Sequence, residues 1–178
     1  MWGETYNHVF GRTTNPYNRK LTPGGSTGGE GALLALKGSP LGVGTDIGGS
    51  LRIPSAFCGL YTLRPSYERL PYCGAANALS GQESISSVLG PMANSMSGIK
   101  IFTKAIIDAK PWTRDPLALR KPWSEQDYAL VEHGGGRRMC FAMMWDNGVV
   151  RPHPPLWRAM RITKMALEAA GHKGLKGN

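Results

Sequence analysis

The apolar residues of this chain fall into short blocks, separated by loops rich in glycine and proline. Residues 30–37 are rich in alanine and leucine and precede Gly38, which predicts a helix that ends at this glycine. Residues 41–45 predict a short buried strand, and residues 60–63 predict another. Pro54 suits the first turn of a short helix that runs to Phe57.

The second half of the chain shows the same alternation. Ser95 or Ser97 is placed to cap a helix that runs to about residue 109, and residues 139–144 predict an apolar strand. A last helix precedes Gly171, and its apolar face at helical spacing comprises Leu156, Ala159, Met160, Thr163, Ala166, Leu167 and Ala170. The order of elements predicts an α/β fold in which helices cover a sheet.

Two segments lack such a pattern. Residues 1–20 are polar, and we expect neither strand nor helix there. Residues 66–94 predict loop and weak strand. The 178 residues suit a single domain, expected to span residues 1–178 with no second domain.

Composition narrows the possible partners. The net charge is +9, but Lys and Arg are spread along the chain and do not alternate with aromatic residues, so we expect no nucleic-acid partner. Three cysteines and four histidines lie far apart and match no metal-site spacing, so we expect neither metal nor cofactor. No secretion signal or membrane-length apolar run is visible, which favours a soluble cytoplasmic protein without membrane association.

Glycine is concentrated between residues 24 and 49, where ten of 26 residues are glycine, against 24 of 178 overall. Two loops, residues 24–29 and 46–50, combine paired glycines with a serine. Successive backbone N–H groups in such loops form a concave site for anions. Beside a nucleophilic serine, this site can hold the oxyanion of a reaction intermediate.

Several short motifs compete for this segment. The phosphate-binding loop and the dinucleotide-binding loop are both absent, because no lysine follows the glycines and Ile47 stands where a glycine is needed. Residues 24–28 match the G-x-S-x-G nucleophile elbow, although residues 19–23 make a poor strand before it. An S-x-x-K match begins at Ser97 without its companion motifs, and a helix cap explains that serine better.

One longer pattern fits the whole segment. The stretches TPGGSTGGEGAL (residues 22–33) and GTDIGGSLRIPSAFCGL (residues 44–60) closely resemble the amidase signature family, and the likeness continues through LRPS (63–66) and GPMA (90–93). The core motifs lie within residues 22–66. The general and acetamide-type amidases of filamentous fungi are the most similar in character. The resemblance implies the amidase-signature fold, a mixed β-sheet flanked by helices.

The resemblance also implies a serine–serine–lysine triad. Ser50 would be the acylating nucleophile, and Ser26, on a cis peptide bond, would be the bridging serine. The backbone N–H groups of Ile47, Gly48, Gly49 and Ser50 would form the oxyanion hole. Four residues would support the two loops: Gly25 and Thr27 in the first, Asp46 and Arg52 in the second. Asp46 and Arg52 are expected to form a pair that braces the second loop.

The family's triad lysine lies well upstream of the bridging serine, whereas only 25 residues precede Ser26 here. Arg19 and Lys20 are the available candidates, and neither lies in the lysine motif. We therefore expect this chain to be a central fragment of the family's domain, incomplete at both ends. We expect little turnover of its small-molecule amide substrate. Its open sheet edges are expected to allow self-association. The alternatives are a non-catalytic binding or regulatory remnant and a serine esterase that uses Ser26.

Overall fold

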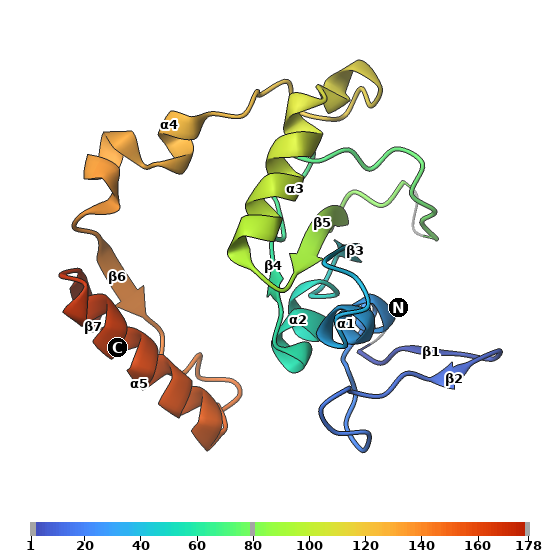
Figure 1. Cartoon of the computed structure of the whole chain (residues 1–178), viewed down its shortest axis with the longest axis horizontal. Helices are drawn as coiled ribbons and strands as arrows, with labels where there is room; N and C mark the ends of the chain where they lie inside the picture. Colours follow the sequence, from blue (N-terminus) through green and yellow to red (C-terminus); the bar gives the residue numbers. More distant parts are fainter. Residues whose placement is uncertain (1–2, 79–80, 177–178) are drawn as a thin grey trace. The chain divides into compact units, whose positions relative to one another are not determined.

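The computed structural model describes residues 3–78 and 81–176, which group into two compact units, Met1–Trp123 and Ser124–Asn178 (Figure 1). The chain was expected to form a single domain, and this remains a prediction. Among the described residues, no helix has the length and apolar character needed to cross a bilayer.

The first unit is built around a three-stranded antiparallel sheet in the order β3-β5-β4. Its strands are β3 (Leu41–Asp46), β5 (Val88–Ala93) and β4 (Tyr61–Thr62). The pairing of β3 with β5 runs from Leu41 opposite Ala93 to Asp46 opposite Val88. This register fixes where β3 ends and the second glycine loop begins.

Three helices pack beside this sheet (Figure 1): α1 (Gly28–Ala35), α2 (Arg52–Cys58) and α3 (Met96–Asp108). Ser95 caps α3, since its side chain accepts a hydrogen bond from the N–H of Gly98. The fully buried centre of the unit consists of Leu34, Leu51 and Met92, one each from α1, the second loop and β5. Because α1 directly follows the first glycine loop and Leu51 follows the second glycine pair, packing in this core holds both loops against the sheet.

The remaining elements of this unit are short. A hairpin of β1 (Tyr6–Asn7) and β2 (Gly11–Arg12) lies near the N-terminus, and a 3-10 helix, η1 (Pro111–Thr113), follows α3. The expectation that residues 1–20 hold no strand is thus wrong. Two-residue strands of exposed polar chain carry no hydrophobic alternation, and alternation is the signal that predicts a strand.

The second unit contains α4 (Glu125–Tyr128), the 3-10 helix η2 (Val131–Gly136), β6 (Cys140–Met143), α5 (Pro154–Ala169) and β7 (Lys173–Lys176). Strands β6 and β7 are parallel and are connected through α5. Trp145 stacks on Trp157, with ring centroids 5.6 Å apart. Gly171, with φ 83°, lies just past the end of α5, as expected of a helix stop.

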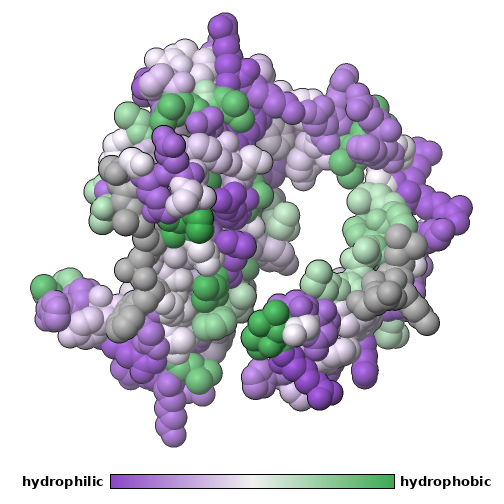
Figure 2. All heavy atoms as spheres, turned by 180° about the vertical axis from the view of Figure 1, so that it is seen from behind, coloured by the Kyte–Doolittle hydropathy of each residue, from purple (hydrophilic) through white to green (hydrophobic). Residues whose placement is uncertain are grey.

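The face by which α5 packs differs from the expected one. Met160 and Leu167 are half-buried, together with Trp157 and Lys164, but the other five residues of the expected face are exposed. Leu156, for example, is 56% exposed. Exposed apolar side chains also occur in the first unit, where Phe10 is 88% and Ile101 67% exposed, and Figure 2 shows such hydrophobic areas among hydrophilic surface.

Candidate active site

The first glycine loop leads into α1 and carries Ser26. Gly24 has φ 82°, and a side chain there would bring its Cβ within 2.9 Å of Ile53 Cγ2 in α2, so the position requires glycine. The peptide bond between Gly25 and Ser26 is cis, as expected. The residues before Ser26 form no strand, so the strand–turn–helix context of a G-x-S-x-G nucleophile elbow is absent from the described chain.

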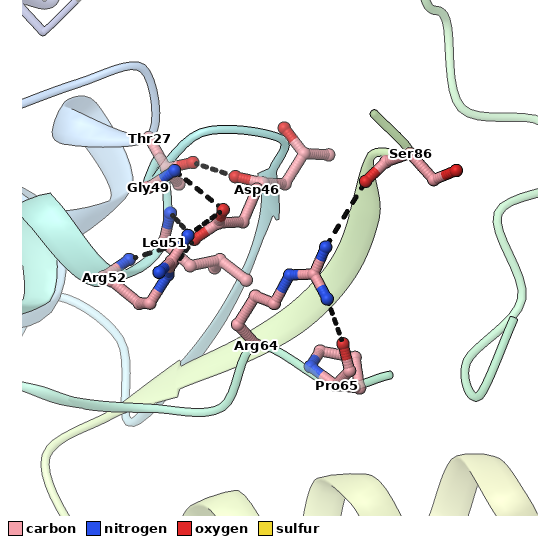
Figure 3. Close-up of polar contacts among 9 residues, drawn as sticks. Thr27, Asp46, Gly49, Leu51, Arg52, Arg64, Pro65 and Ser86 are labelled. Carbon is pink, nitrogen blue, oxygen red and sulfur yellow. Dashed lines mark hydrogen bonds and ion pairs between the residues drawn. The ribbon is translucent and has the colours of Figure 1, made fainter. Parts of the chain in front are cut away.

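The second loop connects β3 to α2 and is organised by Asp46, whose side chain is fully buried (Figure 3). Its carboxylate accepts hydrogen bonds from the backbone N–H groups of Gly49 at 2.8 Å and Leu51 at 3.2 Å. The Arg52 guanidinium donates to both carboxylate oxygens at 3.0 Å. The expected pairing of Asp46 with Arg52 is therefore present, and the carboxylate also closes the loop from inside.

Burial by itself would raise the pKa of the Asp46 carboxyl. The hydrogen bonds from Arg52, Gly49 and Leu51, with the positive charge of Arg52, outweigh this effect and hold the pKa below its ordinary value. Asp46 is therefore ionised at neutral pH. Its role is structural, because every contact of its carboxylate is made to the loop or to Arg52.

Thr27 joins the two loops. Its backbone N–H donates to the carbonyl oxygen of Ser50 at 3.3 Å, and its hydroxyl donates to the carbonyl oxygen of Thr45 at 3.3 Å. Thr27 occupies the N-cap position of α1, but its side chain makes no capping bond. In this structure Thr27 therefore acts as a hydrogen-bond donor between the loops and not as a side-chain cap of α1. The residue after Ser26 thus bonds directly to Ser50.

The two serine hydroxyls themselves are free in the described chain. Ser26 is exposed and Ser50 is half-buried, and neither hydroxyl hydrogen-bonds to a protein group there. The relay contact expected between them is not made in this structure. Arg19 and Lys20, the nearest cationic residues in sequence, are both exposed.

One expected oxyanion donor is otherwise engaged. Gly49, with φ 122°, turns its N–H inward to the Asp46 carboxylate, so this group is not directed at a ligand. The N–H groups of Ile47, Gly48 and Ser50 make no hydrogen bond to the described protein. The sequence could not distinguish these donors, because the difference depends on the backbone angle at Gly49.

A pocket of about 470 Å³ opens beside this site. Three of its lining residues belong to the glycine loops or the end of β3, namely Ser26, Thr45 and Ile47. The others come from the chain between β4 and β5, namely Tyr72, Ala76, Asn77, Ala78 and Ser87. The structure therefore brings Ser26 and one of the expected oxyanion residues to the same hollow. No group of three His, Cys, Asp or Glu side chains suited to a metal ion occurs in the described part of the chain.

Sequence reasoning missed the residues that hold the far wall of this pocket. Asp115 is 4% exposed and accepts hydrogen bonds from the backbone N–H groups of Tyr72 at 2.8 Å and Cys73 at 2.9 Å. Arg64 donates to the carbonyl oxygens of Pro65 and Ser86, which ties the chain after β4 to the start of β5 (Figure 3). Asp115 lies in none of the motifs that carry the resemblance, whereas Arg64 lies in the LRPS stretch (63–66) but was given no role there.

Comparison with known sequences agrees with these features. The sequence model of the Amidase family matches residues 1–176. An acetamidase of Aspergillus oryzae is 45% identical over 170 residues, which cover 95% of this chain and 31% of that protein. Amidase 1 of Gibberella moniliformis is 46% identical over 176 residues, which cover 97% of this chain and 33% of that protein. The chain thus spans about a third of the length of these curated relatives.

Solved structures give the same result. A structure of fatty acid amide hydrolase matches with a TM-score of 0.88 and 37% identity, covering 100% of this chain and 31% of that one. A bacterial aryl acylamidase of the amidase signature family matches with a TM-score of 0.77 and 27% identity, covering 99% and 35%. With mixed α/β architecture, two glycine–serine loops and a family match over residues 1–176, the chain belongs to the amidase signature family of hydrolases.

Proposed function

We propose that this chain carries the acylation centre of a hydrolase that cleaves a carboxylic amide to the acid and ammonia or an amine. Ser50 is the nucleophile and Ser26 the bridging serine. The observation that carries the proposal is the bond from the Thr27 N–H to the Ser50 carbonyl oxygen, since it joins the two serine loops into one unit. The pocket at Ser26 and Ile47 offers room for a substrate beside them.

The proposed reaction proceeds in two halves. The Ser50 hydroxyl oxygen attacks the amide carbon while its proton passes toward Ser26, and the carbonyl oxygen becomes an oxyanion. The N–H groups of Ile47, Gly48 and Ser50 are available to bind that oxyanion, and a single such donor is worth about 2.7–4 kcal/mol in the transition state. The C–N bond then breaks, the leaving nitrogen takes up a proton, and water hydrolyses the acyl-Ser50 ester.

The step that this chain supports least is removal of the Ser50 proton. A serine hydroxyl is a weak nucleophile until a base accepts its proton, and the family's base is a lysine. No lysine of the described residues hydrogen-bonds to Ser26 or Ser50. We therefore expect Ser50 to be acylated about 10²–10⁴-fold more slowly than with a positioned general base, since this is the contribution typical of such a base.

A fluorophosphonate probe tests the proposal, because it phosphonylates nucleophilic serines without a second substrate. We expect slow labelling of the wild-type chain, none in Ser50→Ala and a lower rate in Ser26→Ala. Ser66→Ala removes an exposed serine of the same unit and serves as the control. Equal labelling of the wild type and Ser50→Ala would remove Ser50 from the mechanism, and rapid labelling of the wild type would contradict the expected lack of a base.

A further inference from the structure

The pocket beside Ser26 has a wall that neither glycine loop provides. Tyr72, Ala76, Asn77 and Ala78 come from the segment between β4 and β5, and Ser87 directly precedes β5. All five lie 20 or more residues from the catalytic loops in sequence. A substrate bound at Ser26 and Ile47 therefore touches a surface whose chemistry the signature motifs do not determine.

Chemically, this wall is polar but uncharged. None of the described lining residues of the pocket is Asp, Glu, Lys, Arg or His, and the wall offers hydroxyl and methyl groups. A charged substituent would lose its hydration here without gaining an opposite charge, which is costly. The lining favours an amide whose distal part is neutral.

Tyr72 and Ser87 form the hydrogen-bonding feature of the wall. The Tyr72 hydroxyl donates to Ser87 Oγ at 3.0 Å. In this arrangement the phenol oxygen keeps a free acceptor site, and the Ser87 hydroxyl keeps a proton to donate. The free acceptor site on the Tyr72 oxygen can take the N–H of a neutral amide, while the carbonyl oxygen of that amide lies at the N–H groups of the second loop.

Asp115 holds Tyr72 in place. Its buried carboxylate accepts the backbone N–H groups of Tyr72 and Cys73 on one oxygen and that of Leu117 on the other, at 3.0 Å. Asp115 is 43 residues away from Tyr72 and 42 from Cys73 in sequence. Its carboxylate does not line the pocket, so any effect on a ligand passes through Tyr72.

We propose that residues 72–78 form the substrate-recognising wall of the Ser26–Ser50 site, that the Tyr72 hydroxyl binds an uncharged amide, and that Asp115 is a positioning residue that fixes Tyr72. This proposal rests on the proposed function for the identity of the site. It adds the uncharged character of the distal part of the substrate, and two residues outside the signature motifs.

Binding of benzamide to the full chain, followed by NMR titration, tests the wall without requiring turnover. Benzamide is expected to bind saturably, and 4-carboxybenzamide, which carries one distal negative charge, at least about tenfold more weakly. Tyr72→Phe removes only the hydroxyl and is expected to raise the Kd of benzamide roughly 3- to 10-fold, the effect of one hydrogen bond. Tyr67→Phe, at an exposed tyrosine of the preceding segment, is expected to leave it unchanged.

Asp115 is tested by a double-mutant cycle. Asp115→Asn is expected to weaken benzamide binding in the wild type but hardly at all in Tyr72→Phe, because both changes act through the same hydroxyl. A merely structural role would lower affinity equally in both backgrounds. If Asp115→Asn fails to fold, Tyr72→Phe alone decides the assignment of the wall.

Three results would overturn the inference: no saturable benzamide binding, equal affinity for the charged analogue, or an unchanged Kd in Tyr72→Phe. Failure of the proposed function would be seen in the fluorophosphonate experiment, as serine labelling that does not depend on Ser50. If labelling depends on Ser50 but Tyr72→Phe leaves the Kd of benzamide unchanged, the role of the wall is refuted and the acylation centre is retained.

Discussion

Replacing Asp46 with asparagine removes the charge at the centre of the second loop with almost no change in volume. One carboxylate oxygen faces the N–H of Gly49 and Arg52 Nη2, and the other faces the N–H of Leu51 and Arg52 Nε. Whichever way the asparagine amide turns, its NH₂ group meets donors. At least one buried backbone N–H therefore loses its acceptor.

The cost follows from these contacts. A hydrogen bond to a charged group is worth about 1.5–3 kcal/mol, and one backbone bond of this kind is lost outright. The Arg52 side chain is 57% exposed, so its lost ion pair is counted at the value for surface pairs, about 0–1 kcal/mol. Together these terms predict that Asp46→Asn lowers the free energy of unfolding by about 1.5–4 kcal/mol.

Equilibrium urea unfolding of the full chain at pH 7 measures this difference. Asp108→Asn makes the same chemical change at a half-exposed carboxylate paired with Lys104 within α3, and is expected to cost only about 0.3–0.5 kcal/mol. A loss below about 1 kcal/mol for Asp46→Asn, within the range of exposed pairs, would refute the role of Asp46 as the brace of the second loop.

Three further predictions concern stability. Gly90→Ala places a methyl group against a backbone carbonyl oxygen in the sheet and is expected to cost about 1–3 kcal/mol by urea unfolding, whereas Gly48→Ala meets no atom within 4 Å and should cost less than about 1 kcal/mol. Burial would raise the pKa values of Asp46 and Asp115, but the hydrogen bonds of each carboxylate outweigh this effect and lower both pKa values. The stability that the two carboxylates contribute is therefore complete above the pKa of the unfolded chain, about 4, and is lost as the pH falls through the lower pKa values of the folded chain. An acid titration in which Tm stays flat below pH ~4 would contradict this. Ser55 is 3% exposed and its hydroxyl bonds to no group among the described residues, so Ser55→Ala should raise the unfolding free energy by up to about 1 kcal/mol, and a clear decrease would show that the hydroxyl is satisfied.

The sequence predicted the parts of the fold that have strong local signals. Long contiguous motifs identified both serine loops, and the Ser95 cap, α1 and β3 lie within a few residues of their expected positions. Strand β5 was underestimated because Gly90 and Pro91 are both unfavourable in strands, yet it forms the centre of the sheet. Its pairing with two neighbours and the burial of Met92 in the core are tertiary effects, and they stabilise it there.

The site was predictable to the extent that it lies within the motifs. Ser26, Ser50 and the Asp46–Arg52 pair follow from them, but the engagement of the Gly49 N–H depends on a backbone angle. Asp115 was not predictable, because a single aspartate before a proline carries no pattern and its partners are distant in sequence. Such long-range contacts are available only from the folded chain.

The central claim is that Ser50, and not Ser26, takes up the acyl group. Trypsin cleavage after Lys20, Lys37 and Arg52 places Ser26 on peptide 21–37 and Ser50 on peptide 38–52, so tandem mass spectrometry of the fluorophosphonate-treated chain separates the two. We expect the adduct on Ser50 in peptide 38–52 and an unmodified peptide 21–37. An adduct on Ser26, with Ser50 unmodified, would contradict the account.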